Sequence, residues 1–182
     1  YESQHKPFKI NIETDRDSLL TEIGKITLFE RYLTDEERDG LDNEKDFQLF
    51  KGTYQKVFAR AACYFADNQE HAQRLYDYAS KQWFMFSTPV LSNGGTTRGL
   101  PISCFLNYAE DSCEGLTDNQ TESAMLSRYG GGVGTDFSAI RSIGEGTSTG
   151  NKTTGVIPFI KVIDSTMYAY QQGANRRGSA AI

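Results

Sequence analysis

Cys104 is the residue of this sequence with the clearest potential for chemistry. It follows Ser103 inside an apolar run, residues 102–108, that predicts a buried strand. An unpaired cysteine is most often a small buried hydrophobic residue, and a reactive one needs thiolate character that a sequence does not reveal. The position alone therefore leaves both roles open.

The three cysteines, Cys63, Cys104 and Cys113, exclude two common uses of this residue. They are too few and too irregularly spaced for a disulfide framework, and they form no CxxC pair of the kind that binds structural zinc. Cys63 falls on the apolar face of a predicted helix, which favours a core role. Any chemistry here must therefore come from a thiol.

Polar side chains lie on both sides of the helix predicted after that strand. Asp111 and Ser112 precede the helix, Arg128 lies near its end, and Arg141 follows the next strand. A carboxylate and a hydroxyl can contact base or ribose donors, and guanidinium groups bind phosphate. The residue types suit a nucleotide site, although a solvated turn with surface charges would contain the same residues.

The glycines between this helix and the next strand could bring backbone close to a ligand. We expect Gly130 to end the helix. Gly131 and Gly132 favour a binding role, because a side chain would hold a nucleotide away from the backbone. Residues 130–136 match neither GxxxxGK[ST] nor GxGxxG, which excludes a phosphate loop and a dinucleotide fingerprint.

The first half of the chain has helical periodicity. Apolar residues from Phe47 to Phe65 recur at three- and four-residue spacing, which predicts one helix. A second helix is predicted from Glu70 to Phe84, with Trp83 on its apolar side. We therefore expect a helical domain over residues 1–86.

From Ser87 the pattern changes to α/β order. Turn-forming residues over 87–101 predict a loop that leads into the strand containing Cys104. A helix with a capping box, a strand, a flexible loop, a second helix and the beginning of a strand follow. These elements are expected at 117–129, 133–138, 144–154, 156–173 and 179–182.

The bulk properties restrict the possible partners. A net charge of −5 argues against nucleic acid as a partner, since a large polyanion needs clustered Lys and Arg. A basic pocket for a single nucleotide remains compatible with this charge. The sequence contains neither a long apolar stretch nor a targeting segment, so we expect no membrane contact and a cytoplasmic location.

The sequence contains four ordered segments that are informative together: Ser87-Thr88-Pro89, Ser103 to Leu106, Gly131 to Gly134 with Ile140-Arg141, and Gln172-Gly173 through Arg177-Gly178. In this order, they resemble the large, catalytic subunit of ribonucleotide reductase. Their order and their spacing over about 90 residues make the similarity specific, and it extends over residues 29–182.

The resemblance implies a fold and an activity. The implied α/β fold has an N-terminal helical layer, residues 1–86, followed by the first part of a ten-stranded α/β barrel, residues 87–182. The implied activity is the reduction of ribonucleoside diphosphates to deoxyribonucleotides for DNA synthesis by thiyl-radical chemistry. Because the radical cysteine and the second dithiol cysteine are unmatched, we expect a fragment with an incomplete barrel that is inactive alone. A non-catalytic nucleotide-binding or assembly fragment of a split subunit, and the cobalamin-dependent class, remain alternatives.

The resemblance also assigns roles to individual residues. Cys104 would be catalytic, as one of two thiols that reduce the substrate and become a disulfide. The loops at 144–154 and 172–178 would pass information from effector to substrate. The implied contacts are Thr88, Ser103, Cys104 and Gly132 for substrate, Asp111, Ser112, Cys113, Arg128, Arg141 and Ser148 for the effector, and Gln172 and Arg177 in the specificity loop.

Ligands and partners follow from the same resemblance. The ligands would be a ribonucleotide substrate and a deoxynucleoside triphosphate or ATP as effector, and the chain itself would bind no metal or cofactor directly. The implied partners are a radical-generating beta subunit with a dimetal centre, the remaining part of the alpha subunit, a second copy in a homodimer, and thioredoxin or glutaredoxin as reductant. Adenosylcobalamin would generate the radical in the alternative class.

Overall fold

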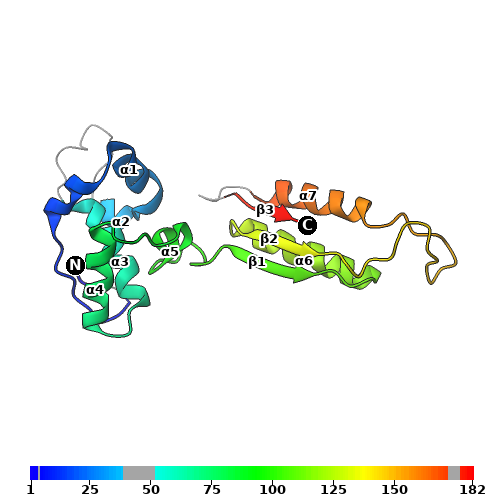
Figure 1. The fold of residues 1–182 in the computed structure, drawn as a ribbon, viewed down its shortest axis with the longest axis horizontal. Coiled ribbons are helices and arrows are strands. Elements are labelled where there is room, and N and C mark those ends of the chain that lie inside the picture. Colours follow the sequence, from blue (N-terminus) through cyan, green and yellow to red (C-terminus); the bar gives the residue numbers. More distant parts are fainter. Residues whose placement is uncertain (4, 39–51, 172–176) are drawn as a thin grey trace. The chain divides into compact units, whose positions relative to one another are not determined.

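The computed structural model describes residues 1–3, 5–38, 52–171 and 177–182 (Figure 1). The chain divides into two compact units, Tyr1–Pro101 and Ile102–Ile182. This division lies later in the chain than the predicted one between residues 86 and 87. The reason is local, because the segment predicted as a loop contains helix α5, Thr88–Asn93, which packs on a helix of the first unit.

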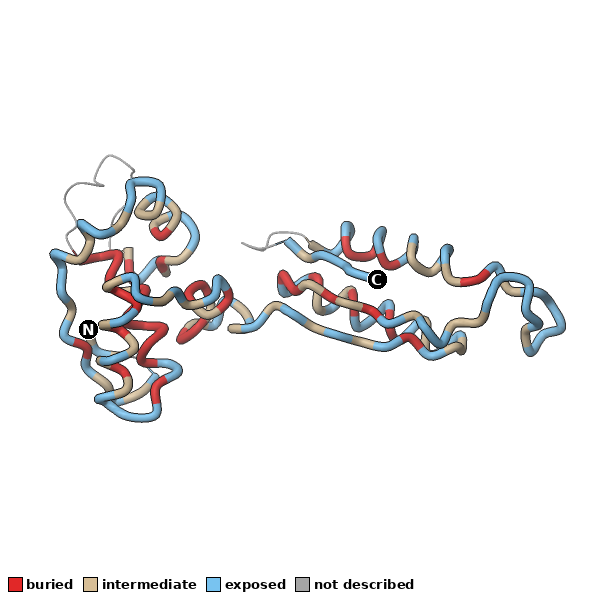
Figure 2. The backbone as a smooth tube through the Cα atoms, viewed as in Figure 1, coloured by how far each residue is buried: buried red, intermediate tan, exposed pale blue. Residues whose placement is uncertain are grey.

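Helices build the first unit. Its core is centred on α3, which is buried along most of its length and packs against α4 (Figure 2). The elements besides α5 are the 3-10 helix η1 (Thr14–Leu19), α1 (Glu22–Thr27), the π-helix η2 (Leu28–Tyr32), α2 (Asp35–Arg38), α3 (Thr53–Phe65) and α4 (Gln69–Ser80). The apolar face predicted from Phe47 to Phe65 is confirmed as buried from Tyr54 to Ala62. Phe65, at the end of α3, is 39% exposed, contrary to the prediction. Phe47 and Phe50 lie outside the described residues.

Helix α4 is shorter than predicted, and Trp83 does not belong to its apolar face. The helix ends at Ser80, and Gln82 then adopts a left-handed backbone with φ of 60°. This conformation turns the chain, so that the Trp83 amide donates to the carbonyl of Tyr78 at 3.0 Å. The Trp83 ring remains 69% exposed and lies against the ring of Tyr78 with 5.4 Å between centroids.

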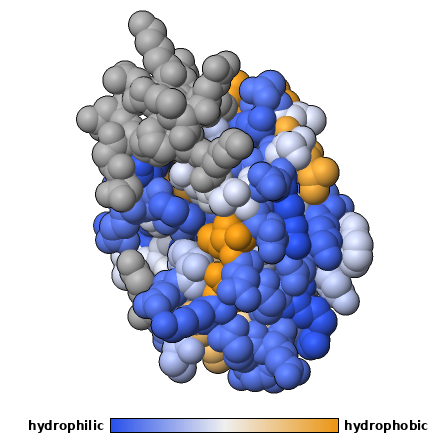
Figure 3. Space-filling model, turned by 90° about the vertical axis from the view of Figure 1, so that its left-hand side faces the viewer, coloured by the Kyte–Doolittle hydropathy of each residue, from blue (hydrophilic) through white to orange (hydrophobic). Residues whose placement is uncertain are grey.

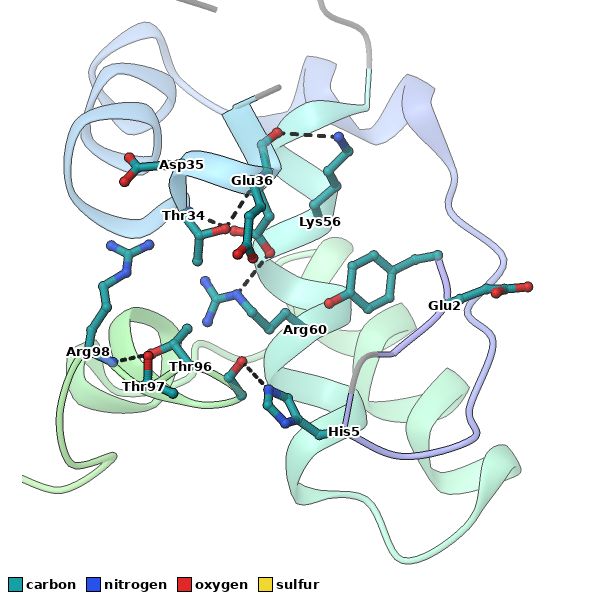
Figure 4. Close-up of a pocket in the computed structure, with 13 residues that line it drawn as sticks. Glu2, His5, Thr34, Asp35, Glu36, Lys56, Arg60, Thr96, Thr97 and Arg98 are labelled. Atoms are coloured by element: carbon teal, nitrogen blue, oxygen red, sulfur yellow. Dashed lines mark hydrogen bonds and ion pairs between the residues drawn. The ribbon is translucent and has the colours of Figure 1, made fainter. Parts of the chain in front are cut away.

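A buried ion pair between Arg60 and Glu37 connects the helices of this unit (Figure 4). Arg60 Nε donates to Glu37 Oε1 at 2.8 Å. Its two other nitrogens donate to the carbonyls of Gly94 at 2.6 Å, Tyr32 at 2.9 Å and Leu91 at 3.0 Å. Because Arg60 and Glu37 are only 4% and 8% exposed, water can contribute little to their solvation. The pair therefore fixes α3, α2, η2 and the end of α5 to one another.

The surface of the molecule is mainly polar on the side shown in Figure 3. The described residues there are mostly hydrophilic, and the apolar ones form small separate groups. Among the described helices, none combines the length and the apolar content needed to cross a membrane.

The second unit is a parallel sheet with two helices on one face. Strands β1 (Cys104–Tyr108), β2 (Gly132–Asp136) and β3 (Ser179–Ala181) pair in that order, joined by α6 (Cys113–Arg128) and α7 (Ile157–Tyr170). The helices cover the face that contains Phe105 and Val133, and their buried sides point toward it (Figure 2). A helical unit followed by the start of a parallel sheet confirms the predicted fold class.

Three boundaries in this unit differ from those expected. Helix α6 begins a turn before the predicted capping box, because the Ser112 hydroxyl accepts the Gly115 amide at 2.9 Å and caps the helix there. Strand β2 ends at Asp136, whose carboxylate accepts the Ser138 amide at 2.8 Å and forms a turn. Helix α7 ends at Tyr170 instead of near residue 173.

The apolar run 102–108 predicted that the strand carrying Cys104 would be buried. This prediction is wrong for one of its two faces. Its residues alternate between half-buried and exposed, and Leu106 is 90% exposed. The half-buried residues point to the helices, and Cys104, Leu106 and Tyr108 point to the other face.

Replacing Arg60 by Met should destabilise the protein strongly. The substitution leaves the buried Glu37 carboxylate without its partner, which costs about 3–5 kcal/mol in comparable buried pairs. Urea unfolding followed by far-UV circular dichroism measures the loss. The control is Lys9→Met, which breaks an exposed ion pair with Glu2 and should change the midpoint little. Equal midpoints for the two variants would show that the buried pair does not hold the helices together.

Candidate functional site

The face of the sheet opposite the helices brings three of the expected substrate contacts together. Cys104 is exposed there, and it is the register partner of Gly132 in β2. Ser103 precedes Cys104, with its hydroxyl oxygen 4.0 Å from the Cys104 sulfur. The fourth expected contact, Thr88, lies in the first unit, where its exposed hydroxyl accepts from the Tyr32 hydroxyl at 3.4 Å.

Gly130, Gly131 and Gly132 are under different structural constraints. Gly130 has φ of +73° and ends α6, which confirms its predicted role as a helix cap. A Cβ on Gly131 would lie 2.7 Å from the Phe105 ring and 3.0 Å from the Leu126 carbonyl oxygen. Close packing therefore accounts for Gly131, for which we expected a binding role. At Gly132 the nearest atom to a Cβ would be the Ser179 hydroxyl oxygen, at 3.0 Å.

A cavity of about 770 Å³ lies at the carboxyl ends of β1 and β2. Its walls are the start of α6, the segment after β2, the loop over residues 147–153 and the first two turns of α7. Ligands of open α/β sheets bind at this edge, and the volume is in the range of small-molecule pockets. Five of the six expected effector contacts line it: Asp111, Ser112, Cys113, Arg141 and Ser148.

An ion pair closes one side of this cavity. Arg141 Nε donates to Asp111 Oδ2 at 2.7 Å, and Arg141 Nη1 donates to the carbonyl of Gly146 at 2.7 Å. Both side chains are about one third exposed, at 32% and 30%, so a ligand can reach them. The guanidinium thus connects the start of α6 to the loop, in which the Thr147 amide donates to the Asn151 carbonyl at 2.7 Å.

The remaining predicted residues lie elsewhere. Arg128 is exposed at the far end of α6, roughly 22 Å along the helix axis from Cys113, at about 1.5 Å per residue. It therefore cannot share a ligand with Asp111 of the same copy. Arg177 is exposed just before β3, and Gln172 lies outside the described residues.

Several residues that line this cavity were not predicted from the sequence. Apolar side chains, Phe137, Phe159 and Ile163, contribute to its lining. Asn119, in the second turn of α6, also lines it and is only 3% exposed. A polar residue in a helix is usually solvated, so its type alone gave no sign of burial.

A second cavity, of about 520 Å³, lies in the helical unit and contains none of the predicted site residues. Its walls carry both signs of charge, including Lys56, Arg98, Asp35 and the Arg60–Glu37 pair (Figure 4). Partial burial and the neighbouring Arg60 lower the pKa of the Arg98 guanidinium. In the part of the chain that the structure describes, His, Cys, Asp and Glu form no group of three or more suited to a metal ion.

A helical unit, a parallel sheet and a cavity at its carboxyl edge define an α/β protein whose cavity lies where proteins of this class usually bind ligands. Residues 18–99 match the family described as ribonucleotide reductase, all-alpha domain, and residues 102–182 match ribonucleotide reductase, barrel domain. The chain therefore belongs to the ribonucleotide reductase large-subunit family.

Individual relatives are similar along most of this chain. The ribonucleoside-diphosphate reductase large subunit of Invertebrate iridescent virus 6 is 39% identical over 174 residues, or 95% of this chain and 16% of that protein. The corresponding subunit alpha of Helicobacter pylori is 34% identical over 178 residues, or 94% of this chain and 21% of that protein. The chain thus spans about a fifth of the length of these relatives.

A solved structure is similar as well. The Actinobacillus ureae class Id ribonucleotide reductase alpha subunit matches with a TM-score of 0.64 and 26% identity. The match covers 88% of this chain and 27% of that one.

Gly131→Ala should destabilise the second unit by about 1–3 kcal/mol, because the added methyl group meets the Phe105 ring and a backbone carbonyl. Gly146→Ala is the matched control, since a Cβ there has no atom within 4 Å and the residue is not in the left-handed region. Thermal unfolding of the two variants compares the effects. If the Gly131 variant were as stable as the Gly146 variant, close packing would not explain why position 131 is glycine.

Proposed function

We propose that this chain works as part of the large subunit of a ribonucleoside-diphosphate reductase, which converts ribonucleotides to deoxyribonucleotides. The observation that carries the proposal is the exposed thiol of Cys104, on a parallel strand beside Gly132 in a chain that matches both domains of the family. Because the described helices of this unit pack on the opposite face of the sheet, a substrate and the rest of a barrel can approach the face that carries Cys104.

Cys104 would supply one of two reducing thiols. Replacing the 2′-hydroxyl by hydrogen and releasing water consumes two electrons and two protons, which two thiols provide as they become a disulfide. Cys63 is a poor partner, since burial raises the pKa of its thiol to about 11, and Cys113 lies in the cavity at the carboxyl edge. The second thiol would therefore come from the remaining part of the alpha subunit.

The substrate would lie against the same face. Ser103 and the backbone at Gly132 flank the thiol. Thr88 is also proposed as a substrate contact, on the ground of the family resemblance of the Ser87-Thr88-Pro89 segment. Hydroxyl groups and backbone amides can donate to the oxygens of a nucleotide without adding bulk. The 172–178 segment, with Gln172 and Arg177, would act as a specificity loop beside the base.

The cavity at the carboxyl edge would hold the effector, a deoxynucleoside triphosphate or ATP. Arg141 would bind phosphate, while Asp111 and Ser112 would contact the sugar or the base. Arg128 would act in a homodimer, because an antiparallel α6 from a second copy would bring its far end to this cavity. That arrangement would give Arg128 a role in effector binding although it is distant from the cavity of its own copy.

The other partners belong to the same proposal. A radical-generating beta subunit would supply the radical, and thioredoxin or glutaredoxin would reduce the disulfide after each turnover, in the cytoplasm. The relatives' names, large subunit and subunit alpha, favour an enzyme of two subunits over the class that uses adenosylcobalamin.

Cys104→Ser should abolish multiple-turnover reduction in the assembled enzyme, because the serine hydroxyl cannot form the disulfide that supplies the electrons. Deoxynucleotide formation with dithiol reductant and the beta subunit measures this loss. Cys63→Ala is the control, since it removes a buried thiol that takes no part in the proposed chemistry and should keep turnover. Sustained turnover by the Cys104 variant would remove the residue from the mechanism.

Arg141→Ala should weaken effector binding about ten- to hundred-fold, which corresponds to the roughly 1.5–3 kcal/mol of a charge-assisted contact. Basal turnover without effector should change far less, and effectors should no longer shift the ratio of pyrimidine to purine reduction. Lys161→Ala removes an exposed charge of α7 outside the cavity lining and serves as the control. If Arg141→Ala abolished basal reduction but kept effector affinity, Arg141 would belong to the active site instead.

A further inference from the structure

Asn119 has an unusual environment for an amide side chain. It is 3% exposed and lines the cavity at the carboxyl edge. Among the described residues, neither its Nδ2 nor its Oδ1 has a hydrogen-bond partner. Folded proteins rarely leave both groups of a buried amide unpaired, because the lost hydration is then not replaced. A bound molecule in the cavity would provide the missing partners.

The lack of hydrogen-bond partners is confined to Asn119 among the buried polar residues on this face of α6. Ser123 and Ser127 follow Asn119 at intervals of four residues, and both are fully buried. The Ser123 hydroxyl accepts from the Asn107 amide at 3.4 Å, and the Ser127 hydroxyl donates to the Met167 carbonyl at 3.0 Å. Asn119 is the member of this row that lines the cavity, and it is the one without a partner.

The position of Asn119 indicates which part of a nucleotide it would meet. The residue lies seven positions after the helix cap at Ser112, or roughly 10 Å along the axis of α6. Among the described lining residues, Arg141 supplies the cationic side chain, and it is bonded to Asp111 beside that cap. Phosphates should therefore lie at the Arg141 end of the cavity. The opposite part of the ligand can extend to Asn119.

The chemistry around Asn119 fits a nucleobase. Phe137, Phe159 and Ile163 contribute apolar lining suited to the faces of a flat ring. The amide offers one donor group and one acceptor, which complements the adjacent acceptor and donor on the polar edge of a base. A phosphate would leave the amide oxygen without a donor.

We propose that Asn119 contacts the base edge of the nucleotide in this cavity and contributes to discrimination among bases. The inference rests on the proposed effector function of the cavity. It assigns a part in base recognition to the second turn of α6, in addition to the sugar or base contacts proposed for Asp111 and Ser112 at the start of the helix.

Binding of dATP, dGTP, dTTP and inorganic tripolyphosphate to the assembled large subunit, measured by calorimetry, tests the proposal. Asn119→Leu keeps a similar volume and removes both hydrogen-bonding groups. We expect about a tenfold or greater loss of affinity for at least one deoxynucleotide, with a changed order of preference among the three. Tripolyphosphate affinity should stay within about twofold of the wild-type value. Ser123→Ala, on the same helix face but outside the cavity lining, should leave all four affinities unchanged.

Three results would contradict the proposal, and each identifies a different error. If wild-type protein binds the deoxynucleotides and Asn119→Leu binds them equally well, an ordered water or another group satisfies the amide, and the inference fails while the effector function stands. A parallel loss for all four ligands would mean that Asn119 only maintains the helix, which also overturns base recognition. If wild-type protein binds none of the deoxynucleotides, the effector function and the inference fail together. Thermal unfolding of each apo variant confirms that binding is compared between folded proteins.

Discussion

The parallel pairing of β1 with β2 is the constraint on which both candidate sites of the second unit depend. Successive residues of a strand point to opposite faces, so the register that places Phe105 and Val133 beneath the helices turns Cys104 to the open face. Parallel neighbours also require a crossover, and α6 provides it. The crossover begins at the carboxyl edge of the sheet and returns at Gly132, beside Cys104. One pairing therefore positions the thiol on a face and the nucleotide-sized cavity at an edge.

Helix α6 consequently belongs to both regions. Its first turns form a wall of the cavity, and its C-terminal end passes through Gly130 and Gly131 into the strand that flanks Cys104. Gly131 packs so closely on Phe105, the residue after Cys104, that an added methyl group has no space. A shift of α6 along its axis would therefore displace Phe105, and with it the neighbouring Cys104, through packed atoms.

The sequence allowed prediction of the elements better than of their ends. The periodicity of residues 54–62 and the α/β order after Ser87 correspond to helices and strands of the structure because burial dominates both patterns. The start of α6 could not be settled, since Ser112 and Thr117 are both hydroxyl residues and only the observed bond to the Gly115 amide distinguishes a cap from an interior residue. Helix α5 was missed because Pro89, read as a turn former, equally suits a first helical turn. The ion pair of Arg141 with Asp111 joins residues 30 positions apart, a contact that no local pattern contains.

The buried polar side chains that line the two cavities, Arg60 in one and Asn119 in the other, contrast in a way that separates structural from binding roles. In the helical unit, all three guanidinium nitrogens of Arg60 donate to protein acceptors, so the charge next to that cavity needs no ligand to be stable. In the second unit, Asn119 lines a cavity of larger volume, and neither of its amide atoms has a hydrogen-bond partner among the described residues. Selection for stability alone would favour an apolar residue at such a position, because an unpaired buried amide costs folding free energy. The retained amide is best explained by a partner that is present only when the cavity is occupied.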